Sequence, residues 1–385
     1  MTLLEVNDLS IRYAVEDGSS VHAADDVSFT VERGETYGLV GESGCGKTTL
    51  AKSLVHLLDS NGYIESGEVW FDATLPAWED DDGNPRREIV EDDSYPVRAD
   101  GKTNLAALST QQIRDIRWRD VALIPQSAMN ALNPVYKVGD QIVEAILRHE
   151  PGTTKREADE RARDLLERVG IEPDRADDYA HQFSGGMKQR AVIAMAMACG
   201  PDLLIADEPT TALDVIIQDR ILEELEKLQE EFGVSILVIS HDISVMAEIC
   251  DRMAVMYGGK VMESGPKEDI FQRTANPYTL GLKNSFPTIT QRNQSLVSIP
   301  GTPPTLRDPE EGCRFRDRCP FVVEECHASH PPMYDVESVE SEGVRRESAD
   351  QRSHRSACYR VDELEQIRTD ATQEDTWTEQ EIENR

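Results

Sequence analysis

FSGGMKQR, residues 183–190, is the stretch that decides the fold of this 385-residue chain. Its two adjacent glycines let backbone amides come close to a phosphate, and a helix that begins here points the positive end of its dipole at that phosphate. Ser184 can cap the helix and also donate its hydroxyl to a phosphate oxygen. The stretch therefore predicts a phosphate-binding element made of Ser184, Gly185 and Gly186.

A second phosphate-binding element lies upstream, where GESGCGKT at residues 41–48 matches the pattern G-x-x-x-x-G-K-[ST]. In such a loop the amides cradle phosphate, Lys47 reaches the β and γ oxygens, and Thr48 ligates magnesium. Because only one of the two elements is a lysine-bearing phosphate loop, the simplest arrangement is two chains that each offer the SGG element to the other's nucleotide. The predicted nucleotide contacts of the loop are Gly41, Ser43, Gly44, Cys45, Gly46, Lys47, Thr48 and Thr49.

Two adjacent carboxylates end the apolar run LLIADE at residues 203–208, which predicts a buried strand of a parallel sheet. Asp207 suits a place beside the magnesium ion, and Glu208 suits the general base that polarises the attacking water. An isolated run of this kind is as often an ordinary strand end. Its place after the SGG stretch and before PTTALD at residues 209–214 favours the catalytic interpretation.

Together these motifs resemble those of the ATP-binding-cassette (ABC) family, and the resemblance implies further site residues. Asp214 matches the D-loop aspartate, which helps set the dimer interface. His241 ends the apolar run VSILVISH at residues 234–241 and matches the switch histidine that contacts the γ-phosphate. Gln126 follows VALIP at residues 121–125 and matches the Q-loop glutamine that senses magnesium and the attacking water.

Tyr13, in the strand-like segment LSIRY at residues 9–13, matches the aromatic residue that stacks on adenine in this family. A strand tyrosine is about as often plain packing, and the acidic segment at residues 15–26 leaves the register of this match open.

The resemblance implies an α/β fold with a P-loop ABC ATPase core, made of a RecA-like parallel sheet, an antiparallel β-subdomain and a helical subdomain that carries the signature. We expect this core over residues 1–270, with the helical subdomain at about 109–195 and a small cysteine-containing C-terminal extension over 271–360. Residues 361–385 are acidic and polar, which predicts a disordered tail. Residues 72–104 are acidic and turn-rich, so we expect an inserted surface loop, with partner binding as the alternative.

Two further stretches, PQSAMNALNP at 125–134 and ANPYT at 275–279, resemble the ATPases of oligopeptide and dipeptide importers. The resemblance implies a subunit that hydrolyses ATP with Mg²⁺ to energise uptake of peptides, nickel or oligosaccharides. Its expected partners are a second ABC ATPase subunit (a paralogue or a second copy), two membrane permease subunits and an extracellular solute-binding protein. An exporter ATPase is the alternative, and a soluble DNA-repair or chromosome-organising ATPase is disfavoured because the chain shows neither long coiled coils nor a basic surface.

The charge balance is strongly acidic, with 73 acidic and 40 basic residues and a net charge of −33. Such a surface repels nucleic acid and anionic lipid, so direct binding to either is disfavoured. Only 10 of the basic residues are lysines, and this composition favours a halophilic source. The chain has no apolar run long enough to span a membrane and no signal-peptide pattern at its start, so we expect a peripheral protein on the cytoplasmic face of the membrane.

Four of the seven cysteines cluster near the C-terminus, and the other three lie in the predicted core as packing or loop residues. Because structural disulfides are rare in the cytoplasm, the cluster indicates a metal site, although the absence of C-x-x-C weakens a zinc ribbon. The spacing resembles the extension of peptide-importer ATPases, several of which hold a 4Fe–4S cluster; zinc and free thiols are the alternatives. The predicted ligands are Cys313, Cys319, Cys326 and Cys358.

Overall fold

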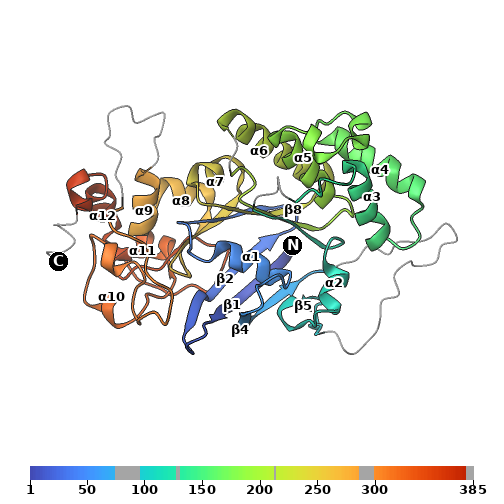
Figure 1. Ribbon diagram of the computed structural model, residues 1–385. Helices are drawn as coiled ribbons and strands as arrows, with labels where there is room; N and C mark the ends of the chain where they lie inside the picture. Colours follow the sequence, from blue (N-terminus) through green and yellow to red (C-terminus); the bar gives the residue numbers. More distant parts are fainter. Residues whose placement is uncertain (74–95, 127–130, 212–213, 286–298, 379–385) are drawn as a thin grey trace.

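Two β-sheets form the centre of the structure, a computed structural model that describes residues 1–73, 96–126, 131–211, 214–285 and 299–378 (Figure 1). Most of the predicted insertion therefore lies outside the described residues. So do residues 127–130 of the Q-loop stretch and residues 379–385 of the predicted tail.

The larger sheet has the strand order β11-β12-β10-β9-β3-β8-β7-β6, and its five strands from β9 to β6 are parallel. β3, β7 and β8 are buried along their whole length, which explains their continuous apolar sequences. Because parallel strands end at one edge, the segments after β3, β6, β7 and β8 come together there. The five parallel strands are β3 (Thr36–Val40), β6 (Val121–Ile124), β7 (Leu203–Asp207), β8 (Ser235–Ser240) and β9 (Arg252–Tyr257).

The smaller sheet is antiparallel, with the order β2-β1-β4-β5. The ring of Phe29 stacks on that of Tyr37 from the larger sheet, with 5.3 Å between centroids, so the two sheets share a core. Its strands are β1 (Thr2–Ala14), β2 (Ser20–Glu32), β4 (Gly62–Phe71) and β5 (Thr103–Asn104).

Helices α3 to α6 gather at one end of the molecule (Figure 1). α4 begins at a capping box in which Thr154 and Glu157 each bind the other's backbone N–H, as their spacing predicts. In the described part of the first 250 residues, the helices are α1 (Lys47–Leu54), α2 (Gln112–Ile116), α3 (Val138–His149), α4 (Lys155–Arg168), α5 (Gly185–Ala196), α6 (Val215–Phe232) and α7 (Ile243–Ile249), with 3₁₀ turns at Leu105–Ala107, Pro173–Asp177 and Ala180–Gln182.

The C-terminal part continues the larger sheet, because β10 (Lys260–Pro266) pairs with β9 on one side and with β12 (Arg355–Ser356) on the other. β11 (Tyr334–Asp335) pairs in turn with β12. The remaining elements are α8 (Lys267–Gln272), α9 (Pro277–Asn284), α10 (Glu325–Ala328), α11 (Val336–Glu342), α12 (Leu364–Asp370) and 3₁₀ turns at Arg316–Arg318, Val361–Glu363 and Glu374–Trp377. No helix among the described residues is long and apolar enough to cross a membrane.

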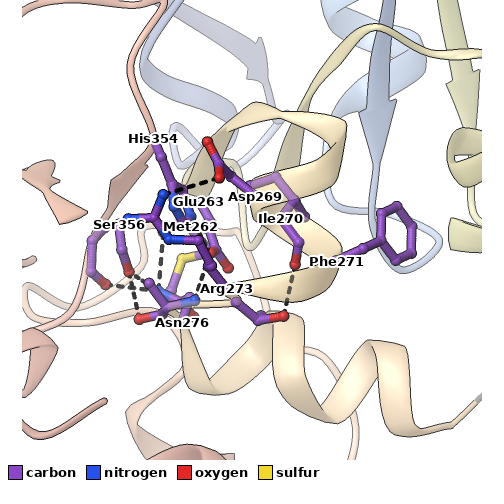
Figure 2. Close-up of polar contacts among 12 residues, drawn as sticks. Met262, Glu263, Asp269, Ile270, Phe271, Arg273, Asn276, His354 and Ser356 are labelled. Atoms are coloured by element: carbon purple, nitrogen blue, oxygen red, sulfur yellow. Dashed lines mark hydrogen bonds and ion pairs between the residues drawn. The ribbon is translucent and has the colours of Figure 1, made fainter. Parts of the chain in front are cut away.

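A buried polar network holds this C-terminal part against the core (Figure 2). The side-chain nitrogen of Asn276 donates to the carbonyls of Met262 and Ala357, both at 3.0 Å. His354 Nε2 lies 2.8 Å from a carboxylate oxygen of Glu263, and both side chains are almost fully buried. Since burying polar groups is favourable only when they are paired, this network fixes how β12 meets β10.

The predicted disorder of the tail is wrong for residues 361–378, where the structure has helix α12 and a 3₁₀ turn. Ile367 and Ala371 are fully buried, and the indole nitrogen of Trp377 donates to the carbonyl of Ala371 at 3.0 Å. A Cβ on Gly281 of α9 would lie 2.7 Å from the ring of Trp377, so the tail packs directly on α9. A few apolar side chains thus order a segment that is otherwise acidic and polar.

Candidate active site

The loop at residues 41–46 joins β3 to α1 and is closely surrounded by backbone. A Cβ on Gly41 would lie 2.1 Å from the carbonyl oxygen of Met256, and one on Gly46 would lie 1.9 Å from that of Ala23. Both glycines also have φ in the left-handed range, at 156° and 103°. The loop therefore requires glycine at these two positions, and the resulting backbone shape suits the predicted phosphate cradle.

Lys47 directs its ammonium group back into this loop. Nζ donates to the carbonyls of Gly41 at 2.7 Å and Glu42 at 3.0 Å, and it lies 3.5 Å from the sulfur of Cys45. Burial raises the pKa of the Cys45 thiol, so this side chain is a neutral packing group. Lys47 is thus placed at the centre of the loop, where a bound phosphate would meet it.

The two residues predicted to lie at the magnesium ion, Thr48 and Asp207, are in contact. Oγ1 of Thr48 donates to Oδ1 of Asp207 at 3.0 Å. Burial, reinforced by the neighbouring Glu208 carboxylate, raises the pKa of Asp207 above its usual value. A hydroxyl and a carboxylate at one point form an oxygen donor set that fits Mg²⁺.

The side chain of Glu208 contacts those of two other predicted site residues, Gln126 and His241. Its Oε2 accepts from Nε2 of Gln126 at 2.9 Å, and its Oε1 is 3.3 Å from Nδ1 of His241. These side chains follow β7, β6 and β8, so the parallel register alone brings them together. Glu208 has φ of 49°, an uncommon backbone conformation for glutamate that is typical of functional positions.

Thr211 is a site residue that the sequence analysis did not assign. Its hydroxyl donates to Oε2 of Glu208 at 2.8 Å. Burial alone would raise the pKa of Glu208, but hydrogen bonds from Thr211 and His241 outweigh it and lower that pKa. Glu208 is therefore ionised near neutral pH, as a general base must be. The only sequence signal for Thr211 is its place three residues after the glutamate.

The SGG element begins α5, and Ser184 caps that helix by accepting from the N–H of Met187 at 3.3 Å. Asp214 caps α6 in the same way, accepting from the N–H of Ile217 at 3.0 Å. The two helix starts are neighbours, because a Cβ on Gly186 would lie 3.0 Å from the side chain of Ile217. α5 lies with α3, α4 and α6, apart from α1 and its phosphate loop (Figure 1).

Tyr13 lies beside the start of α1, with its hydroxyl 3.4 Å from Oγ1 of Thr49. Its ring also packs on Gly62 of β4, where a Cβ would lie 2.8 Å away. The adenine contact of Tyr13 and the nucleotide contact of Thr49 therefore stay predictions.

The four C-terminal cysteines line one small cavity of about 20 Å³, together with Phe315 and Phe321. Within the ranges described, no three or more histidine, cysteine or acidic side chains are arranged to hold a metal ion. Burial raises the pKa of Cys313 and of Cys358 to about 12, so without a metal these thiols stay protonated.

Comparisons with known proteins agree with this geometry. Residues 24–211 match the family model described as ABC transporter, and residues 262–326 match that of the oligopeptide/dipeptide transporter C-terminal region. The chain is 44% identical over 325 residues to the putative peptide import ATP-binding protein BMEII0863 of Brucella melitensis, covering 82% of this chain and 88% of that protein. It is 40% identical over 332 residues to the oligopeptide transport ATP-binding protein OppD of Salmonella typhimurium, covering 86% and 89%.

Among solved structures, the chain is similar to the dimeric bacterial ABC transporter cassette MJ0796, with a TM-score of 0.55 and 24% identity over 69% of this chain and 98% of that one. The same cassette bound to ADP and Pi gives a TM-score of 0.55 at 23% identity, with the same coverage. At this level of identity the likeness shows the fold alone.

Proposed function

Because this chain belongs to the ABC transporter ATPases of oligopeptide/dipeptide importer type, we propose that Glu208, His241 and Gln126 perform the ATP hydrolysis that drives solute uptake. The predicted ABC ATPase fold and the predicted importer-ATPase function are confirmed by these matches. The observation that carries the residue assignment is the meeting of the three side chains at the ends of β6, β7 and β8.

In the proposed reaction, the loop amides and Lys47 hold the β- and γ-phosphates of ATP, and Thr48 and Asp207 hold Mg²⁺. The bound ion would offset charge on the phosphate oxygens. Glu208, which hydrogen bonds from Thr211 and His241 keep ionised, accepts a proton from the attacking water. The amide of Gln126 and the ring of His241 orient the Glu208 carboxylate toward that water.

We further propose that a second cassette, a paralogue or another copy, completes the site with its own SGG element. Ser184 places the N–H groups of the first turn of α5 at a helix start, which suits a partner's γ-phosphate. Asp214, at the neighbouring start of α6, would set the contact between the two cassettes. Such sharing makes hydrolysis depend on pairing.

A groove beside Gln126 fits the cytoplasmic helix of a membrane permease, which would place this chain on the cytoplasmic face of the membrane. The groove has a volume of about 210 Å³ and a mainly apolar lining that includes Leu57, Trp118, Leu123 and Pro125. Pro125 directly precedes Gln126, so movement of a docked helix would reach the hydrolysis site through this segment. A solute-binding protein outside the cell would deliver the peptide.

Leu57→Glu is expected to abolish recovery of permeases with this chain from detergent-solubilised native membranes, because it places a charge in the apolar groove. ATP binding should be unchanged. Leu147→Glu, at an exposed position of α3 outside the groove lining, is the matched control and should keep the permeases bound. Mass spectrometry of the recovered complex identifies the permeases and the solute-binding protein. Recovery of the permeases with the Leu57 variant would exclude the groove as their docking site.

We also propose that the four cysteines of the extension hold a 4Fe–4S cluster. The chemistry of the donors suits such a cluster, since all four cysteines line one cavity. The cavity of about 20 Å³ is small, so the cysteines would have to move apart to admit a cluster, and a single zinc ion requires less movement.

We propose in addition that the protein comes from a high-salt cytoplasm, because its composition is acidic and poor in lysine.

Protein purified without oxygen is expected to be brown, with about four iron and four sulfide per chain. Cys319→Ser should bleach it and lower the stability of the extension, whereas Cys199→Ser, at a buried cysteine of the core, should keep the colour. Colourless protein with one equivalent of zinc per chain would show that the four cysteines hold zinc and would contradict the cluster. Protein without metal would leave four free thiols and contradict the proposal.

A further inference from the structure

The C-terminal extension reaches the phosphate loop itself, at Glu42. The Arg318 guanidinium binds the Glu42 carboxylate through two bonds, Nη1 to Oε2 at 2.8 Å and Nη2 to Oε1 at 3.2 Å. Such a fork is the strongest and most directional form of an arginine–carboxylate pair. Arg318 directly precedes Cys319, so the contact joins the cysteine-lined segment to the nucleotide site.

Arg318 is fixed on all sides, unlike a residue in an ordinary surface ion pair. Its side chain is 8% exposed, and Nη1 also donates to the hydroxyl of Tyr257 at 3.0 Å. Nε donates to the carbonyl of Pro300 at 2.7 Å, and Nη2 to that of Ile299 at 3.3 Å. Every nitrogen of the guanidinium is therefore engaged. The Glu42 side chain is 22% exposed, so the pair is partly buried, and solvent weakens it less than it weakens an exposed pair.

Glu42 is held at its other two groups as well. Its N–H donates to the hydroxyl of Tyr278 on α9 at 3.0 Å, and its carbonyl accepts from Nζ of Lys47 at 3.0 Å. The ring of Tyr278 packs against those of Tyr257 and Phe315, at centroid distances of 4.6 and 5.3 Å. The bonds to two of these groups, the carboxylate and the N–H, thus come from beyond residue 270, outside the expected ATPase core.

We propose that Arg318 is a positioning residue for ATP, acting through Glu42. The inference rests on the proposed nucleotide site. A carboxylate in a phosphate loop repels the negative charge of ATP unless a cation neutralises it. Left unpaired, the Glu42 carboxylate would also compete with the phosphates for Lys47, whose ammonium already binds the carbonyl of Glu42. Arg318 removes both effects and holds the loop in shape.

Two roles for Arg318, neutralising the Glu42 carboxylate or only anchoring the extension, predict different ATP affinities when Glu42 is also substituted. Arg318→Gln leaves the Glu42 carboxylate unpaired, whereas Glu42→Gln removes the charge itself. The double variant Glu42→Gln/Arg318→Gln should therefore bind ATP better than Arg318→Gln alone. If Arg318 only anchored the extension, removing Glu42 as well would give no recovery.

The test measures the ATP dissociation constant of the full-length chain by titration calorimetry. Arg318→Gln is expected to weaken ATP binding by about 10-fold, and the double variant to recover to within about threefold of Glu42→Gln. Arg314→Gln is the matched control, because Arg314 ties the same extension to Asp25 of β2 at 2.5 Å without touching the loop. It should lower the melting temperature while ATP affinity stays that of the wild type.

Wild-type affinity in Arg318→Gln, or a double variant as weak as Arg318→Gln, would overturn the inference while the proposed function stands. A wild-type chain that binds no ATP would overturn the proposed function instead. Should Arg318→Gln fail to fold, Arg318→Lys takes its place, because lysine keeps the positive charge but cannot form the two-bond fork. At low salt, the ATP affinity of Arg318→Lys should be higher than the about 10-fold weakened affinity expected when the Glu42 carboxylate is unpaired. An affinity in Arg318→Lys that does not depend on salt would contradict neutralisation.

Discussion

Glu208→Gln is expected to slow ATP hydrolysis by roughly 10²-fold or more while ATP still binds. Glutamine keeps one oxygen to accept from Gln126 and Thr211, so the local geometry is preserved, but an amide cannot take the proton of the attacking water. Single-turnover hydrolysis and ATP titration on the same preparation separate the two effects. The variant should also accumulate as a closed, ATP-bound pair on size exclusion.

Lys47→Ala provides the contrast to this result. It removes the ammonium that lies inside the phosphate loop, so ATP affinity itself should fall. Hydrolysis near the wild-type rate in Glu208→Gln would contradict the assignment of Glu208 as the general base.

Gly185→Asp is expected to abolish ATP-driven pairing and transport while the isolated chain still binds ATP. The substitution places a carboxylate in the first turn of α5, where a partner's γ-phosphate would lie. An acidic residue at a helix start does not destabilise the helix, so the loss can be attributed to the partner's phosphate. Analytical ultracentrifugation with ATP measures the pairing.

Arg156→Asp is the control for this variant, since it adds negative charge at an exposed position of α4 in the same region of helices. It should pair normally. Unchanged pairing of Gly185→Asp with the partner cassette would mean that this chain does not share its SGG element across a dimer.

The hydrolysis site could be predicted because its residues follow buried strands. The apolar runs that end at Gln126, Glu208 and His241 become β6, β7 and β8, which are parallel neighbours. Their side chains must therefore meet at one edge of the sheet. The spacing of the motifs and the order of the strands are therefore sufficient to predict the hydrolysis site.

Contacts between distant segments could not be predicted in this way. Arg318 and Glu42 lie 276 residues apart, and no periodicity in the sequence links them. The disorder predicted for the tail from its acidic composition fails for a related reason. Ile367, Ala371 and Trp377 are buried, and the ring of Trp377 packs on Gly281 of α9. Thr211 has a hydroxyl that only the folded loop aims at Glu208.

Peptide transport across the membrane of proteoliposomes tests most directly whether ATP hydrolysis by this chain drives import. The vesicles would contain the complex recovered from native membranes, with this chain facing outward and a labelled peptide mixture with the solute-binding protein inside. Our model predicts that external ATP moves peptide out of the lumen and that a complex assembled with Glu208→Gln does not. Equal transport by the wild-type and Glu208→Gln complexes, or transport without ATP, would contradict it.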